Sequence, residues 1–214
     1  AHIQQPITME GILTAPEAAV NNPPIAAPLH LFDCCPVSDG AAAVVLVSEA
    51  VAERLAGPKV RLAGIGQATD THAVHERSDP TDLKAVRLAS EKAFSMAGLT
   101  PADVDVVELH DAFTILEIAE SEAAGFFPRG EGHKALERGE THLDGSLPIN
   151  PSGGLKAKGH PVGATGVAHL VEITWQLRGE AGARQIDRAK VGYACNFGGF
   201  GNNVIATVLQ KEAK

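Results

Sequence analysis

Two histidines and one cysteine stand out as residues that could do chemistry together. His110 follows an apolar run, His160 lies in a glycine-rich loop just before a predicted helix, and Cys195 follows a second apolar run. In open α/β sheets, ligands bind outside the carboxyl ends of the strands, so residues at such positions can converge. Imidazole and thiol groups transfer protons or attack carbonyl groups in many enzymes. The sequence therefore predicts a site for acid–base or nucleophilic chemistry.

Each of these residues also has a purely structural interpretation. His110 could be a strand-end histidine that is bonded to its neighbour Asp111. His160 could be a loop residue that is bonded to the backbone. Cys195 could be a buried cysteine that packs as a small apolar residue. The residue types alone leave both interpretations open.

The loop around His160 is the part of the chain on which the predicted site depends most. The stretch 150–166 is rich in glycine and proline and is expected to be irregular. Apolar residues then recur at helical spacing, so a helix is expected to begin near Gly163. A glycine-rich turn that leads into a helix presents unpaired backbone N–H groups and the positive end of the helix dipole.

Three glycine-containing segments fail the tests for phosphate or dinucleotide binding. The segment 159–166 lacks the Gly-Lys-Ser/Thr ending of a P-loop, and the segments 64–69 and 199–204 lack the third glycine of the dinucleotide fingerprint. The nine histidines show no metal-ligand spacing, and no Cys-x-x-Cys pair occurs. We therefore expect no metal and no tightly bound cofactor.

The elements that must position these residues alternate between strands and helices. Residues 1–38 contain six prolines and are expected to form an irregular connector. Strands are expected at 41–47, 60–66, 104–109, 190–195 and 203–209, and helices at 49–55, 82–97, 112–124, 134–138 and 163–177. This alternation predicts an α/β fold with a largely parallel sheet, in which the last two strands form an antiparallel pair.

The composition excludes several classes of partner. The chain has 214 residues, of which 44% are hydrophobic and 21% charged, as in a water-soluble globular protein. A net charge of -8 without a lysine or arginine run argues against nucleic acid and anionic membranes. No apolar run reaches membrane-spanning length, and no signal-peptide pattern follows Ala1, where the chain looks entered partway. The adjacent Cys34 and Cys35 have no histidine nearby, which indicates packing roles and a reducing compartment such as the cytoplasm.

Three motifs occur in a fixed order along the chain. They are His110-Asp-Ala-Phe113, Gly159-His-Pro-Val-Gly-Ala-Thr-Gly166 and Cys195-Asn-Phe-Gly-Gly-Phe-Gly201. In this order they resemble the C-terminal half of a thiolase. Many thiolases have Asn-Glu-Ala-Phe at the first motif, and the spelling His-Asp-Ala-Phe resembles the sterol-carrier-protein-associated and archaeal branches.

The resemblance also implies a fold and a division of the chain. The segment Ser38-Asp-Gly-Ala-Ala-Ala-Val-Val45 resembles the strand that closes the N-terminal half of a thiolase. Residues 1–58 would then be a connector plus the last strand and helix of that half. Residues 59–214 would be the C-terminal domain of the layered αβαβα fold, a mixed sheet flanked by helices.

Thiolases exchange acyl groups with coenzyme A. One cysteine attacks the acyl-CoA and is acylated, and a second cysteine moves the proton at the α-carbon. The resemblance implies that His160 takes the proton from the nucleophile and donates to the thioester oxygen of the acyl-CoA. His110 would occupy the position that holds a water in the same oxyanion hole, and Cys195 would be the acid/base cysteine.

Three further positions carry roles by the same resemblance. The backbone N–H of Phe197 would help to hold the oxyanion of the acyl-enzyme. Phe113 would make an apolar contact to the substrate near the thioester, and Gly163 would belong to the substrate-binding loop. Coenzyme A enters as a substrate and not as a bound cofactor.

The resemblance covers only one half of a thiolase active site. The nucleophilic cysteine of the family lies in the N-terminal half, and neither Cys34 nor Cys35 precedes the strand that would carry it. We therefore expect the 214 residues alone to have no thiolase activity, and the other half to lie in the same or a separate chain. Two alternatives remain: a thiolase-like lyase that cleaves CoA thioesters by a retro-aldol reaction, and a non-catalytic binding subunit.

The expected partners follow from the same reasoning. They are an acyl-CoA substrate, the N-terminal half of a thiolase and further copies of the chain in a homo-oligomer. Some thiolases of the resembled branch also work with a small zinc- and OB-fold-containing protein.

Overall fold

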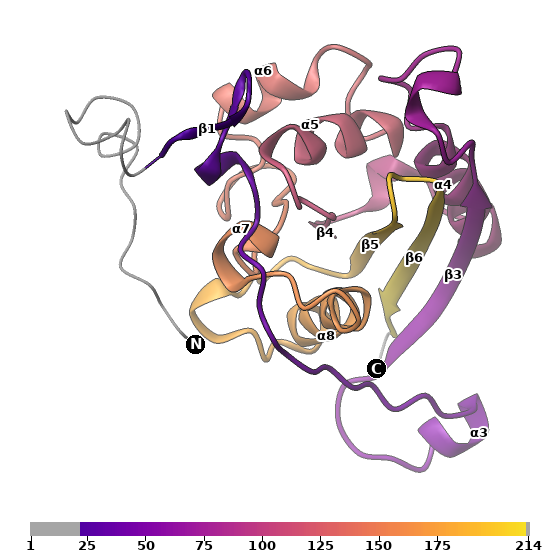
Figure 1. The fold of residues 1–214 in the computed structure, drawn as a ribbon. Helices are drawn as coiled ribbons and strands as arrows, with labels where there is room; N and C mark the ends of the chain where they lie inside the picture. The colour runs from indigo at the N-terminus through magenta and orange to yellow at the C-terminus, as the bar shows by residue number, and fades with distance from the viewer. Residues whose placement is uncertain (1–21, 213–214) are drawn as a thin grey trace.

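A four-stranded mixed sheet forms the centre of the computed structural model, which describes residues 22–212 (Figure 1). The strand order is β3-β6-β5-β4, with β3 at Val60–Thr69, β6 at Asn203–Lys211, β5 at Val191–Gly198 and β4 at Val106–Glu108. Only β4 and β5 are parallel, whereas β6 is antiparallel to both of its neighbours. The predicted antiparallel pair of last strands is confirmed, and the predicted largely parallel sheet is wrong. The alternation of strands and helices along the sequence does not reveal that β6 inserts between β5 and β3.

Helix α4, Lys84–Ala97, covers one face of the sheet and was predicted closely by its apolar stripe. Gly98 ends it in the left-handed conformation with a φ of 67°, as expected for a C-terminal glycine. A Cβ atom on Gly64 would collide with the carbonyl oxygen of Ala93, and one on Gly66 with that of Ala89. These two glycines of β3 therefore allow the strand and α4 to pack closely. This packing role accounts for the two glycines without a dinucleotide-binding function.

Helix α8, Thr165–Arg178, covers the opposite face of the sheet (Figure 1). Its fully buried Ile173 and Leu177 form an apolar cluster with Val106 of β4 and Ala194 of β5. The side chains of Tyr193 and Cys195 belong to the other cluster, under α4. Because successive strand residues point to opposite faces, β5 contributes to both layers. The predicted mixed sheet flanked by helices is confirmed.

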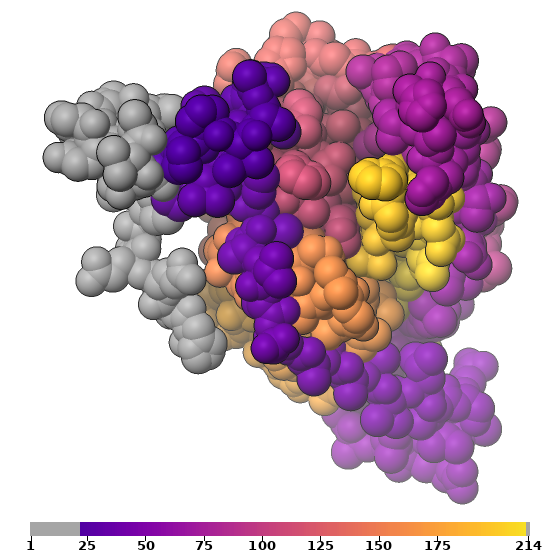
Figure 2. All heavy atoms as spheres, viewed as in Figure 1, coloured from indigo at the N-terminus to yellow at the C-terminus, as the bar shows by residue number. Residues whose placement is uncertain are grey.

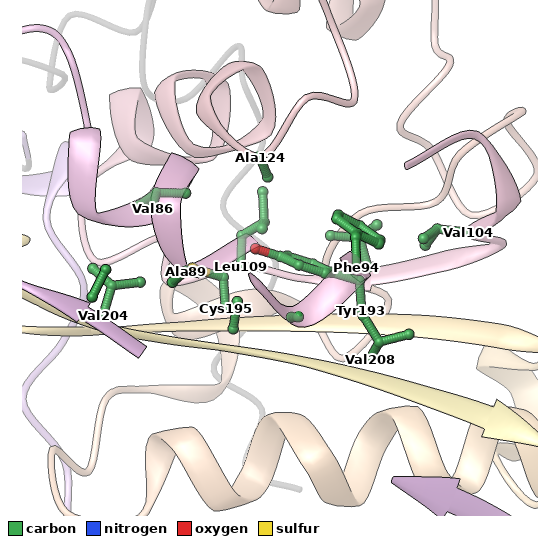
Figure 3. Packing of buried hydrophobic residues seen from close by; sticks show 14 of the residues in the cluster. Val86, Ala89, Phe94, Val104, Leu109, Ala124, Tyr193, Cys195, Val204 and Val208 are labelled. Carbon is green, nitrogen blue, oxygen red and sulfur yellow. The ribbon is translucent and has the colours of Figure 1, made fainter. Parts of the chain in front are cut away.

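The core under α4 is built largely from small aliphatic residues and a few aromatic rings (Figure 3). The rings of Phe94 and Tyr193 stack with their centroids 5.4 Å apart. The hydroxyl of the fully buried Tyr193 lies 2.7 Å from the Ser90 hydroxyl, so its polar end is satisfied inside the core.

The remaining helices lie between the strands in the sequence. They are α5 at Thr114–Ala123, α6 at Gly132–Glu137 and α7 at Gly154–Lys158, with 3-10 turns at Leu31–Asp33, Val74–Glu76, Pro101–Asp103 and Gly182–Arg184. A capping box opens the turn at Pro101–Asp103, because the Asp103 carboxylate accepts from the backbone N–H of Thr100 at 2.8 Å. Helix α7 falls in the stretch that was expected to be irregular. That expectation was wrong because Gly153 and Gly159, both with positive φ, bracket one short turn of helix.

The segment before β3 lies along the surface of the molecule (Figures 1 and 2). It contains a small hairpin of β1, Pro24–Ala26, and β2, Leu29–His30, and later α3, Glu49–Ala52. Part of the predicted irregular connector, residues 1–21, lies outside the described residues.

The buried strand predicted at 41–47 is wrong for the chain as described. Among residues 22–212, nothing pairs with this segment, and Val45 and Leu46 are 89% and 75% exposed. An apolar run predicts burial, but it becomes a strand only where a neighbouring strand accepts its hydrogen bonds.

The predicted division of the chain between residues 58 and 59 stays a prediction. Within the described range, no helix has both the length and the apolar character to cross a membrane.

Candidate functional site

The parallel pairing of β4 and β5 brings His110 beside Asn196. Glu108 pairs with Ala194, so the residues two positions further on lie side by side at the same end of both strands. The ring Nδ1 of His110 lies 3.1 Å from the side-chain Oδ1 of Asn196. With an oxygen as its partner, that Nδ1 carries a hydrogen, and the Nε2 of the neutral ring is an acceptor.

Glu120 and Asp111 fix the backbone on either side of this turn. The backbone N–H of His110 donates to Oε2 of Glu120 at 3.1 Å. Asp111 accepts from the backbone N–H of Leu155 at 2.7 Å, which ties the end of β4 to α7. The alternative in which His110 is bonded to the Asp111 side chain does not match these contacts.

His160 is held at both its backbone and its ring. Its N–H donates to the carbonyl of Pro36 at 3.2 Å, and its ring Nδ1 lies 2.7 Å from Oγ1 of Thr165. The preceding Gly159 has a φ of 87°, and a Cβ atom there would collide with the Ser38 hydroxyl. The loop therefore needs glycine at this point to bring the histidine against the 36–38 segment.

The structure brings the rings of His110 and His160 together. Their centroids are 4.7 Å apart and their planes are nearly perpendicular, at 89°. The His110 ring also stacks on the ring of Phe197, with centroids 5.7 Å apart and planes at 10°. The predicted convergence of the two histidine motifs is thus present in the fold.

Burial keeps both imidazoles neutral. Burial, together with the neighbouring His160, lowers the pKa of His110 to about 4. Burial also lowers the pKa of His160 from its ordinary value, although the carboxylate of Asp111 opposes the change. At neutral pH each ring therefore has one nitrogen free to accept a proton.

Cys195 lies in a different environment from this pair of rings. The strand that was expected to end at Cys195 continues to Gly198, so the residue is an interior strand position on the face opposite to Asn196. Its side chain is fully buried in the core cluster under α4 (Figure 3). Burial raises the pKa of the thiol well above its usual range, and the nearby Glu120 carboxyl raises it further. These surroundings match the packing interpretation of Cys195.

Two other buried side chains near the site carry no signal in the sequence. Glu120 is fully buried, and its Oε1 has no hydrogen-bond partner among the described residues. Burial is the main cause that raises its pKa well above the usual value. His169 of α8 is also fully buried, with its ring centroid 6.4 Å from that of His110, and neither ring nitrogen has a partner within residues 22–212.

The other predicted site residues have distinct environments. Phe197 lies within β5 opposite Val204, and the Phe113 side chain at the start of α5 is 42% exposed. Gly163 faces open space, in a shallow depression formed by residues 38–42 and 161–164. Phe113 and Gly163 are thus accessible from solvent.

The three cysteines are all free. Cys34 and Cys35 are partly buried beside α7, where the Lys156 ammonium donates to the Cys34 carbonyl. Burial raises the pKa of the Cys35 thiol, although Lys156 partly offsets the effect. Such a thiol is a poor nucleophile, in agreement with the predicted packing role.

Comparison with known proteins decides the family. Residues 66–211 match the family described as thiolase C-terminal domain-like. The chain belongs to the thiolase family. Over 195 residues it is 47% identical to an acetyl-CoA acetyltransferase from Methanothermobacter thermautotrophicus, covering 91% of this chain and 51% of that protein. It is also 42% identical over 187 residues to sterol carrier protein 2 from Homo sapiens, covering 85% of this chain and 34% of the human protein.

A solved structure shares the same fold. The solved structure of an Ltp2-ChsH2(DUF35) aldolase superposes with a TM-score of 0.80 at 26% identity, covering 92% of this chain and 51% of that one. The predicted thiolase-like fold and the resemblance to the archaeal and sterol-carrier branches are confirmed. The chain spans about half the length of the archaeal enzyme and about a third of the human protein.

Proposed function

We propose that this chain supplies the C-terminal half of the active site of a thiolase-type acyl-CoA acyltransferase. The reaction would be thiolysis of a 3-oxoacyl-CoA or the reverse Claisen condensation of two acyl-CoAs. The observation that carries the proposal is the pair of facing, neutral imidazoles of His110 and His160. The similarity to an acetyl-CoA acetyltransferase supports it.

His160 is the proposed general base of acylation. A neutral imidazole with one nitrogen held by Thr165 can use the other to accept the proton of a nucleophilic thiol. The resulting imidazolium can then donate to the oxygen of the thioester, where negative charge develops in the transition state.

His110 is the proposed second element of the same oxyanion site. With Nδ1 bonded to Asn196, its Nε2 can accept from a water, and that water can donate to the oxyanion. The Phe197 N–H is the proposed donor to the oxyanion of the acyl-enzyme. The exposed Phe113 and the open Gly163 are proposed to contact the acyl-CoA.

The chain on its own is proposed to be inactive. A thiolase needs a nucleophilic cysteine, and the partly buried Cys35 does not have the environment of one. That cysteine would come from the N-terminal half, in the same or a separate chain, which would also cover the exposed segment 41–47. Coenzyme A would act as a substrate, and the free cysteines fit a reducing compartment such as the cytoplasm. Homo-oligomers and a small zinc- and OB-fold-containing protein are further proposed partners.

A thiolase-like lyase is the second candidate, and one specific observation favours it. The Cys195 thiol is fully buried, whereas a retro-aldol cleavage of a CoA thioester needs no cysteine pair. The similarity in fold to a protein named an aldolase points in the same direction. A non-catalytic binding subunit would show no sulfur chemistry even when the other half is supplied.

The deciding experiment combines intact mass with activity in a native preparation. We expect thiolysis of acetoacetyl-CoA to co-purify with this chain only where a second polypeptide, or a chain of about twice the length, is present. A nucleophilic cysteine labelled by acetyl-CoA should lie outside the 214 residues. Thiolysis by the 214 residues alone would contradict the inactivity proposal. An active assembly that cleaves aldol adducts but does not thiolyse acetoacetyl-CoA would favour the lyase.

A further inference from the structure

Thr165 is the side chain that lies against the ring Nδ1 of His160. It is the first residue of α8 and is 1% exposed. Its Oγ1 lies 2.7 Å from the ring Nδ1 of His160 and 3.2 Å from the carbonyl oxygen of Pro161. That carbonyl also accepts the backbone N–H groups of Ala164, at 2.8 Å, and of Thr165 itself, at 3.0 Å. The hydroxyl is therefore fixed in the first turn of the helix, between the ring and the backbone.

Both contacts of this hydroxyl can be hydrogen bonds in only one arrangement of the protons. The Pro161 carbonyl can only accept, so the single hydroxyl hydrogen of Thr165 must point to it. Oγ1 then meets His160 with a lone pair, and Nδ1 must donate. In the opposite arrangement the hydroxyl would donate to Nδ1, and its contact to Pro161 would have no hydrogen.

We infer that Thr165 is a positioning residue that holds His160 as the Nδ1–H tautomer, so that Nε2 is the nitrogen that accepts the proton. This inference rests on the proposed role of His160 as general base. It adds a requirement to that role. A histidine at position 160 is not enough by itself, because a free imidazole interconverts between both tautomers.

The proposed acylation step shows what Thr165 contributes. The nucleophilic thiol transfers its proton to Nε2, and the thiolate sulfur forms a bond to the thioester carbon. The bond between that carbon and the coenzyme A sulfur then breaks, and the coenzyme A thiolate recovers the proton from Nε2. Nδ1–H donates to Thr165 throughout, so the hydroxyl stabilises the imidazolium in the middle of the step and keeps the ring in one orientation.

The first test reads the tautomer directly by the 15N chemical shifts of the His160 ring in the purified chain. We expect a protonated Nδ1 and an unprotonated Nε2 in the wild type and in Thr165→Ser, which keeps the hydroxyl. Thr165→Val has nearly the same shape but no hydroxyl, and should shift His160 towards the Nε2–H tautomer. If Thr165→Val fails to fold, Thr165→Ala provides the same loss with less crowding.

The second test measures acylation by acetyl-CoA in the complete enzyme, with the half that carries the nucleophile. Thr165→Val should lower the rate about 10- to 100-fold, a part of the 10²–10⁴-fold that a general base typically contributes, and Thr165→Ser should restore most of it. An Nε2–H wild-type ring, an unchanged tautomer in Thr165→Val or an unchanged acylation rate would each overturn the inference. If the wild-type enzyme transfers no acyl group, the proposed function fails, while the 15N experiment still decides the role of Thr165.

Discussion

The two faces of β5 near its carboxyl end differ in which side chains a substrate can reach. On one face, Asn196 bonds His110, whose ring meets the partly exposed ring of His160. On the other face, the Cys195 side chain is sealed in the core under α4, near Glu120 and Tyr193. Two adjacent residues of one motif thus lie on opposite faces of β5. We call the side of Asn196, with His110 and His160, the accessible face, and the side of Cys195 the sealed face.

This difference separates residues that can exchange protons with a substrate from residues that cannot do so in the present conformation. His160 is neutral, partly exposed and held by one nitrogen, as a general base must be. The Cys195 thiol is fully buried, and its raised pKa keeps it protonated. For Cys195 to act as the acid/base cysteine, substrate binding or the second half of the enzyme would have to open its surroundings.

Removing the imidazole from the accessible face should have the largest effect. His160→Ala in the complete enzyme should lower acylation by about 10³-fold or more, because the base and an oxyanion donor are lost together. Rapid-quench measurement of acyl-enzyme formation from acetyl-CoA would report this step alone. His142→Ala removes an exposed histidine and should leave the rate unchanged. Near-normal acylation in His160→Ala would contradict the assignment of the site to this face.

The sealed face is tested by Cys195→Ser, for which we expect a smaller and more selective loss. If the enzyme is a thiolase with Cys195 as the acid/base group, thiolysis of acetoacetyl-CoA should fall by about 10²-fold while acylation by acetyl-CoA persists. Cys35→Ser is the matched control, since that thiol belongs to the 22–58 segment and is only partly buried. A Cys195→Ser enzyme with an unchanged rate would exclude the cysteine from the reaction and favour the lyase.

The accessible face could be predicted from the sequence because its geometry follows from local rules. The apolar runs before His110 and Cys195 predict strands, and the glycine-rich loop before α8 predicts where His160 lies. Parallel pairing of β4 and β5 then brings the strand ends to one edge. The stripe and terminal glycine of α4 are local in the same sense, and α4 was predicted closely.

The sealed face could not be predicted, because it depends on where β5 ends and on how β6 pairs. Three more residues of strand follow Cys195, and they turn it from a strand-end residue into an interior one. On the accessible face, the contact between His110 and Asn196 was also not predicted, because it depends on a pairing register that no local pattern encodes. The strand predicted at 41–47 was wrong for the opposite reason: its apolar pattern is local, but no strand among residues 22–212 pairs with it and its side chains are exposed.

A third substitution measures how firmly the sealed face excludes charge, and its effect is on stability. Burial raises the pKa of Glu120 well above the ordinary value, which is about 4.3 in an unfolded chain. Above that unfolded value the folded protein binds one proton more than the unfolded chain, so its stability falls as the pH rises. Glu120→Gln removes the titration but keeps an oxygen for the N–H of His110.

We therefore expect Glu120→Gln to be more stable than the wild type at pH 8 and nearly equal to it at pH 4.5. A pKa difference of one unit corresponds to about 1.4 kcal/mol, so the melting temperature at pH 8 should rise by about 3 °C or more. Calorimetry at both pH values would measure this, with Glu91→Gln on the exposed face of α4 as a control that should shift little. Equal effects of Glu120→Gln at both pH values would mean that the carboxyl is ionised in the fold. In that case water reaches the Cys195 side of β5, and the contrast between the two faces would disappear.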